Sequence, residues 1–214
     1  MFRRHAFLIA WFGALALLLA TAAGAEIPSP SNSTAPAFIR VVGSTAGVPD
    51  TVAGRFVVTV RGTSTNPFPG AFVSVDVSGC PDIRLATDQL NPNYTVIGYC
   101  VNHTIGAWTN NDGVVAFTLV GSSWSAGTHA GLGCARLYAN GVLLSTPIVS
   151  AFDLDGMGGV TTADLSLWLD DFGTHVYRGR GDYDGNGSVS TGDLSLWLAE
   201  FGTHRSSVTL ASCP

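Results

Sequence analysis

Residues 164–175 read DLSLWLDDFGTH and residues 193–204 read DLSLWLAEFGTH, so ten of twelve positions are identical at a spacing of 29 residues. Close internal identity at a fixed spacing is typical of a duplicated structural unit. In the first copy the apolar residues Leu165, Trp168, Leu169 and Phe172 recur at i, i+3, i+4 and i+7, and the second copy keeps the pattern. This period predicts two short amphipathic helices that pack stripe against stripe.

An acidic, glycine-bearing loop precedes each predicted helix. The first loop (residues 153–164) reads DLDGMGGVTTAD, and the second loop (residues 182–193) reads DYDGNGSVSTGD. Calcium takes six to eight oxygen ligands, and a twelve-residue EF-hand-type loop supplies them from positions 1, 3, 5, 7, 9 and 12. In the second loop these positions are Asp182, Asp184, Asn186, the Ser188 carbonyl, Ser190 and Asp193. We therefore predict a calcium site in the second loop.

The first loop departs from this pattern at position 5. Met157 carries a thioether there, and calcium does not take a soft sulfur ligand. The ligands that remain are Asp153, Asp155, the Gly159 carbonyl, Thr161 and Asp164. With water in the gap, we expect a weaker calcium site in the first loop.

The two loop–helix repeats (residues 151–205) resemble a dockerin module, in which each calcium loop runs straight into a helix. The resemblance implies calcium as the cofactor and a cohesin-like protein module as the partner, within extracellular assemblies that break down polysaccharides. Dockerins usually contact their partner at loop positions 10 and 11, which implies Thr162 and Thr191 as partner-binding candidates. Many dockerins follow a long linker, whereas here only residues 147–152 precede the first loop. A fixed structural cap on the preceding domain is therefore a second interpretation.

Leu167 and Leu196 lie about 200° around their helices from Leu165 and Leu194, opposite the apolar stripe. One interpretation is that they pack against the preceding domain. The other is that they form a partner-binding surface, because exposed apolar residues that gather on one face often mark such sites.

The segment 38–150 shows short β-prone runs separated by turn residues. The candidate strands are Phe38–Val42, Gly54–Arg61, Ala71–Ser78, Val114–Val120, Gly133–Ala139 and Val142–Ser145. This spacing predicts a β-sandwich of roughly seven strands. The runs NPFPGAFVSV (residues 66–75) and NDGVVAFTL (residues 111–119) resemble bacterial immunoglobulin-like domains of the invasin/intimin type. The expected fold class is thus mainly β with a small α module, an immunoglobulin-like β-sandwich followed by the dockerin-like repeats.

The N-terminal residues 1–25 have the pattern of a secretory signal peptide. Arg3 and Arg4 precede an apolar run, and Ala23-Gly24-Ala25 offers a cleavage site between small residues. We therefore expect a protein that is secreted or held at a bacterial cell surface and does not span the membrane. Residues 26–37 are rich in Pro, Ser and Thr and are predicted to form a flexible leader. Residues 206–214 are expected to form a C-terminal tail.

The exported chain would retain four cysteines, which in that compartment predict disulfides. Four cysteines allow three pairings, and the sequence does not decide among them. We favour Cys80–Cys100 together with Cys134–Cys213.

Charge is concentrated near the C-terminus. Residues 151–204 hold nine acids against two arginines, and the chain has no lysine. This balance favours a cation as partner and argues against nucleic acid. The sequence contains no nucleophile-elbow, zinc-protease or phosphate-loop motif, so we predict that the protein is not an enzyme. Trp108 and Trp124 are expected in the core, with stacking on a sugar as the alternative.

Together these patterns predict a secreted, non-enzymatic calcium-binding protein whose C-terminal module mediates protein–protein assembly or caps the β domain. One alternative is a carbohydrate-binding accessory protein docked into a polysaccharide-degrading complex. Another is a calcium-dependent surface or filament subunit.

Overall fold

The structure, a computed structural model, describes residues 26–89, 97–99, 102–124 and 132–204. The predicted signal peptide (residues 1–25), the tail (residues 206–214), Cys100 and Cys213 lie outside the described residues. Among the described residues, none of the helices combines the length and the hydropathy that crossing a membrane requires.

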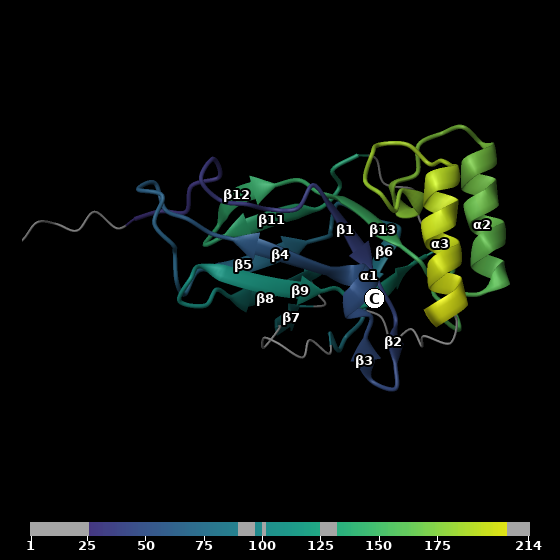
Figure 1. Cartoon of the computed structure of the whole chain (residues 1–214), viewed down its shortest axis with the longest axis horizontal. Coiled ribbons are helices and arrows are strands. Elements are labelled where there is room, and N and C mark those ends of the chain that lie inside the picture. Colours follow the sequence, from purple (N-terminus) through teal and green to yellow (C-terminus); the bar gives the residue numbers. More distant parts are fainter. Residues whose placement is uncertain (1–25, 90–96, 100–101, 125–131, 205–214) are drawn as a thin grey trace, which may run out of the picture.

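The described chain is mainly β, with a small helical unit at one end of the β layers (Figure 1). The strands are β1 (Phe38–Val41), β2 (Ser44–Thr45), β3 (Val48–Pro49), β4 (Arg55–Thr59), β5 (Phe72–Asp76), β6 (Ile83–Leu85), β7 (Ile97–Tyr99), β8 (Thr104–Trp108), β9 (Val114–Thr118), β10 (Gly121–Ser123), β11 (Arg136–Ala139), β12 (Val142–Ser145) and β13 (Ile148–Ala151). The helices are α1 (Thr51–Gly54), α2 (Thr162–Gly173), the 3-10 helix η2 (Gly179–Gly181) and α3 (Thr191–His204).

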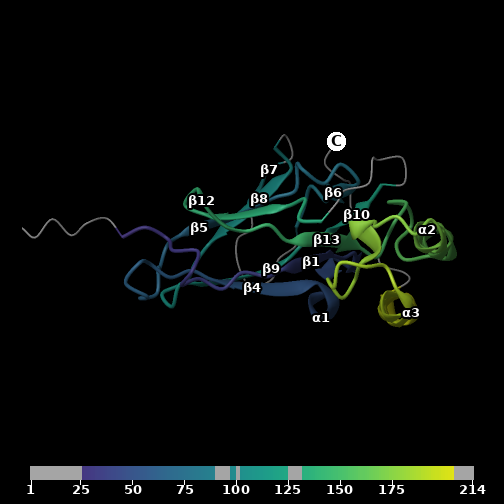
Figure 2. The same cartoon turned by 90° about the horizontal axis from the view of Figure 1, so that it is seen from above.

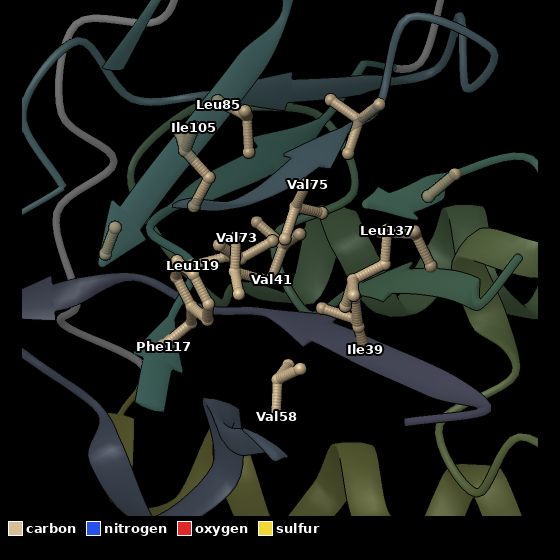
Figure 3. Packing of buried hydrophobic residues seen from close by; sticks show 14 of the residues in the cluster. Ile39, Val41, Val58, Val73, Val75, Leu85, Ile105, Phe117, Leu119 and Leu137 are labelled. Carbon is tan, nitrogen blue, oxygen red and sulfur yellow. The ribbon is translucent and has the colours of Figure 1, made fainter. Parts of the chain in front are cut away.

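The strands form two layers that face each other (Figure 2). One layer is a sheet of five strands in the order β12-β11-β5-β8-β7, and the other contains the antiparallel pair β4–β9 and strand β1, which pairs in parallel with β13. Alternate residues of β5 explain the arrangement, since Val73 and Val75 are fully buried whereas Phe72, Ser74 and Asp76 are partly exposed. Figure 3 shows these valines packed among aliphatic and aromatic side chains from both layers.

Each of the six predicted strands contains an observed strand, and β12 has the predicted bounds. Strand β13 was not predicted. Its residues Val149, Ser150 and Ala151 are all buried, so the alternation that marks a strand with one wet face is missing. The run that read as a short linker is therefore a core strand that leads into the first loop.

The predicted flexible leader, residues 26–37, is wrong. Thr34 and Thr59 exchange backbone hydrogen bonds at 2.8 and 2.9 Å, and the Ser29 N–H donates to the Arg61 carbonyl at 2.8 Å. A segment rich in Pro and Ser also suits the edge of a sheet, because an edge strand tolerates residues that cannot donate on its outer side. These residues extend the layer that contains β4.

The favoured pairing of Cys80 with Cys100 is wrong, because Cys80 is bonded to Cys134 across a sequence separation of 54. Cys80 follows β5 and Cys134 precedes β11, and these two strands are antiparallel neighbours. Sheet pairing therefore brings the two cysteines together, with their Cα atoms 5.1 Å apart. The predicted partners Cys100 and Cys213 are not among the described residues.

A second hydrophobic cluster joins the helical unit to the β layers. Its buried members are Val42, Phe152, Leu154, Val160, Trp168, Tyr183 and Trp197. The Phe152 and Tyr183 rings stack with centroids 4.7 Å apart, and the Tyr183 hydroxyl donates to the Ala151 carbonyl at 3.1 Å. Arg40 Nε from β1 donates to the Tyr183 carbonyl at 2.6 Å. The helical unit is thus packed onto the end of the β layers, not separated from them by a linker.

Candidate metal centre

The two repeats are locked together by a reciprocal pair of hydrogen bonds. Trp168 Nε1 in α2 donates to the Gly181 carbonyl at 3.2 Å, and Trp197 Nε1 in α3 donates to the Phe152 carbonyl at 3.1 Å. Gly181 directly precedes the second loop and Phe152 directly precedes the first, so each helix holds the start of the opposite loop. The duplication seen in the sequence is therefore a duplication in three dimensions, with each repeat completing the other.

The predicted apolar stripes are only partly correct. Trp168 and Trp197 are fully buried, but Leu169 and Leu198 are each 48% exposed. In α2 the buried line instead runs through Asp164, Trp168 and Asp171 at i, i+4 and i+7. The prediction missed this line because it followed the apolar residues alone, whereas these acids are buried for a reason given below.

The second loop gathers three carboxylates. Asp182, Asp184 and Asp193 each offer an oxygen, and these atoms lie within 4.8 Å of one another. Asp182 and Asp193 are fully buried. Gly187 at position 6 has φ 86°, a conformation that side chains disfavour, and lets the loop turn sharply around the oxygens. The spacing read from the sequence thus converges in space.

The carboxylate at position 12 is also the cap of its helix. Asp193 Oδ2 accepts from both the backbone N–H and the hydroxyl of Ser190, at 2.8 and 2.9 Å. Its Oδ1 accepts from the backbone N–H groups of Tyr183 and Asp184, at 2.7 and 3.1 Å. One side chain therefore ties the start of the loop to the start of α3 and holds its own oxygens in fixed directions.

The other predicted second-loop ligands lie in the same turn. The Asn186 side-chain amide donates to Asp184 Oδ2 at 2.8 Å, and Asn186 Oδ1 accepts from the Ser188 backbone N–H and hydroxyl. The Ser190 hydroxyl faces Asp193. The side chains at positions 3, 5 and 7 are thus bonded to one another, and the side chain at position 9 is bonded to that at position 12.

The first loop repeats this arrangement. Asp153, Asp155 and Asp164 also bring carboxylate oxygens within 4.8 Å of one another. Asp164 Oδ2 accepts from the Thr161 backbone N–H and hydroxyl, which completes a capping box at the start of α2. Gly159 at position 7 is buried, with φ 81°. The first loop has the fold of the second despite its different position 5.

Burial makes the negative charges in these clusters unfavourable without a counter-ion. It raises the pKa of Asp164 above its usual range, and it does the same for Asp182, where the nearby Asp193 charge adds to the effect. A bound cation would offset both the desolvation of the carboxylates and their mutual repulsion.

The donors fit a hard divalent cation better than a soft one. Within each cluster they are carboxylates, and hydroxyl, amide and backbone carbonyl oxygens of the same loop are the additional candidates, which is the donor set of Ca²⁺ or Mg²⁺. Met157 fits no such role, because its thioether is a soft ligand, and its side chain is 69% exposed at the surface of the first loop. The structure therefore contains two acidic clusters that could bind a metal, and the second has the fuller set of oxygens.

The partner-binding candidates lie in different surroundings. Thr162 and Thr191 are exposed at the first residues of α2 and α3. Leu167 and Leu196 are half-buried against the second hydrophobic cluster. This cluster includes Val42 of the β domain, which supports the packing interpretation for both leucines.

Two buried contacts of the helical unit were not predicted. Arg180 Nε and Nη2 donate to Asp171 at 2.7 and 2.9 Å, and both residues are buried. At the equivalent position in α3, the Glu200 side chain is hydrogen-bonded to Asp50, the residue that caps α1. Arg180 carried a usable signal, since it is one of only two arginines in the acidic segment. Asp50, distant in the sequence, carried none.

The burial of Asp171 and Glu200 thus has a structural reason, because each acid joins its helix to another element. Asp171 and Glu200, together with the buried Asp164 and Asp193, are the acidic side chains on the inner faces of the two helices. No family model, curated protein or solved structure matches the chain.

Proposed function

We propose that residues 151–205 form a calcium-binding module that caps the β domain of a secreted, non-enzymatic protein and serves in its assembly with other proteins. The observation that carries the proposal is the convergence of positions 1, 3 and 12 of both loops, at a repeat of 29 residues, into two clusters of carboxylate oxygens. An ordinary acidic turn on a protein surface would not be expected to bring three carboxylates so close together, because they repel one another. The packing of the two repeats through reciprocal tryptophan bonds supports the proposal that the fold depends on the metal.

Calcium is favoured over other cations by the donor set. Zinc prefers imidazole and thiolate ligands, and magnesium demands near-ideal octahedral geometry and keeps much of its water. A flexible twelve-residue loop that offers carboxylates, an amide and a backbone carbonyl suits the larger ion. The second loop is the stronger site, and water replaces the missing oxygen at position 5 in the first.

The capping role is supported by how the module is attached. The main chain passes from β13 into Asp153 without a spacer, and the Ser123 N–H in β10 donates to the Asp153 carbonyl at 2.7 Å. In the second loop Gly185, with φ 72°, lies against the Phe38 ring, where a side chain would clash. Both loops thus rest on the β layers, so a partner that binds the module would meet it in a fixed orientation.

The proposed partner is a protein module of the cohesin type, as the resemblance to dockerins implies. Thr162 and Thr191 are candidates for its polar contacts, since both are exposed beside the metal loops. The immunoglobulin-like character of the β domain belongs to the same proposal, and the two-layer arrangement with a common core supports it.

Thermal unfolding of the whole chain in calcium and in excess chelator tests the calcium function. We expect calcium to raise the unfolding midpoint, because an ion that binds only the folded state stabilises it by mass action. The matched control replaces Asp182, Asp184 and Asp193 with asparagine, which keeps the size of each side chain and removes three charges. Equal midpoints for the natural chain in calcium and in chelator would refute the proposal.

A second candidate function, carbohydrate binding, is favoured by one observation. Both tryptophans expected in the core are instead at the surface, with Trp108 55% exposed and Trp124 40% exposed. The Trp108 ring lies 4.9 Å from the Phe72 ring on the outer face of the five-stranded sheet, where a sugar ring could stack. Retention of the natural chain on an insoluble polysaccharide, lost in Trp108→Ala, would support this function, and equal retention of both would reject it.

A further inference from the structure

The connector between α2 and the second loop (residues 174–181) is bonded to both of the elements that it joins. Its Arg180 forms a two-point ion pair with Asp171 of α2, at 2.7 and 2.9 Å. Its Tyr177 hydroxyl donates to Oδ2 of Asp182, the first residue of the loop, at 3.0 Å. Buried bidentate ion pairs fix geometry, so the position of the tyrosine follows from that of the helix.

Tyr177 acts on a carboxylate that the metal would need. Asp182 holds position 1 of the second loop and is fully buried. Its Oδ1 accepts from the backbone of Gly185 and Asn186, at 2.8 and 3.2 Å, and its Oδ2 accepts from the Gly187 N–H at 2.9 Å as well as from Tyr177. The phenol thus adds a donor from outside the loop to those that the loop provides itself.

Such a contact has a known effect on metal ligands. A hydrogen bond from an outer residue fixes the orientation of a ligating carboxylate before the metal arrives. The residue 29 positions before Tyr177 is Ile148, so the first repeat has no tyrosine at the equivalent position. The tyrosine contact is therefore a feature of the second repeat and not of the duplicated pattern.

We propose that Tyr177 is a positioning residue of the second site, which orients Asp182 from the connector and raises the calcium affinity of that site. This inference rests on the proposed calcium function. It adds a determinant that lies outside the twelve-residue loop.

Calcium titration of the whole Tyr177→Phe chain by calorimetry, starting from metal-free protein, tests the inference. We expect the binding event of the second site to weaken by about 10-fold, the lower end of what the loss of an outer-shell partner costs. The event of the first site should keep its dissociation constant. Asp184→Asn and Asp155→Asn, each of which removes one carboxylate from one loop, identify which event belongs to which site.

Tyr138→Phe is the matched control. It removes a hydroxyl from β11, a strand of the five-stranded sheet, and leaves both loops and the connector unchanged. We expect the dissociation constants of Tyr138→Phe to equal those of the natural chain, and calcium to raise its unfolding midpoint by as much as it raises that of the natural chain. Tyr177→Phe should instead reduce the stabilisation gained from calcium, by about 1.4 kcal/mol for a 10-fold weaker site.

The outcomes separate the inference from the proposal beneath it. If the natural chain binds no calcium, the proposed function fails. If the natural chain binds calcium and Tyr177→Phe binds it equally well, the calcium function stands and the role of Tyr177 is wrong. Equal weakening of both sites in Tyr177→Phe would also overturn the inference, because it would indicate a general loosening of the module.

Discussion

Replacing Glu200 with glutamine should remove a pH dependence from the junction between the helical unit and the β layers. Glu200 in α3 is hydrogen-bonded to Asp50, which caps α1 by accepting from the Val52 and Ala53 N–H groups. Both carboxyl groups are buried, so one of them must hold a proton for the contact to form. Glutamine keeps a donor of the same shape and cannot ionise.

The size of the effect follows from the environment of Glu200. Burial, followed by the charge and hydrogen bond of Asp50, raises the pKa of Glu200 from 4.5 to about 8, while Arg40 acts in the opposite direction. Between pH 4.5 and about 8, Glu200 therefore keeps its proton in the folded state but has lost it in the unfolded state. The free energy of unfolding must fall as the pH rises through this window. A difference of one proton between the folded and unfolded states changes the free energy of unfolding by about 1.4 kcal/mol per pH unit. Partial hydration of the site reduces the expected loss to about 1–2 kcal/mol between roughly pH 5.5 and 7.5.

Denaturant unfolding in saturating calcium measures this difference. We expect Glu200→Gln to match the natural chain near pH 5.5 and to exceed its free energy of unfolding near pH 7.5. Calcium affinity rises with pH in both proteins, so the comparison cancels that trend. Asp170→Asn, which removes an exposed acid from α2, is the control and should leave the pH dependence unchanged. Parallel stability curves for the natural chain and Glu200→Gln would refute the reasoning.

Three further changes test other parts of the account. Met157→Asp supplies the oxygen missing from the first loop and should tighten that site by about 10-fold or more, as a calcium titration would reveal; no gain would show that position 5 does not face the ion. Trp197→Phe leaves the buried Phe152 carbonyl without its donor and should lower the free energy of unfolding by about 1–3 kcal/mol in a denaturant titration, whereas an unchanged value would mean that the reciprocal bonds are unimportant. Replacing Cys80 and Cys134 together with serine opens a loop with a sequence separation of 54 and should cost about 4 kcal/mol by the same titration, and a cost near zero would contradict the pairing.

The parts of the fold that follow from local pattern were predictable from the sequence. Alternation in residues 72–76 identified β5, and the spacing of Asp182, Asp184 and Asp193 identified a cluster that the structure brings together. Both predictions rest on rules that operate within a dozen residues. The disulfide, by contrast, depends on which strands become neighbours, and Cys80 meets Cys134 only because β5 pairs with β11.

The helix faces show where local pattern fails. The sequence led us to expect Leu169 and Leu198 inside, but both are exposed, while Asp171 and Glu200 are buried. A carboxylate can replace an apolar residue on an inner face when it has a partner, here Arg180 for Asp171 and Asp50 for Glu200. The sequence marks Arg180 as one of two arginines in the acidic segment but does not show which acid it meets, and Asp50 lies far along the chain, so both pairings become visible only in the tertiary structure.

Native mass spectrometry of the whole chain at increasing calcium concentration tests the central claim most directly, since it counts bound ions one by one. We predict two calcium ions per chain, the first bound at lower concentration, and loss of the tighter one when Asp182, Asp184 and Asp193 are all replaced with asparagine. A natural chain that remains free of calcium at millimolar concentrations, or a variant that binds as many ions as the natural chain, would contradict the claim that these loops hold the metal.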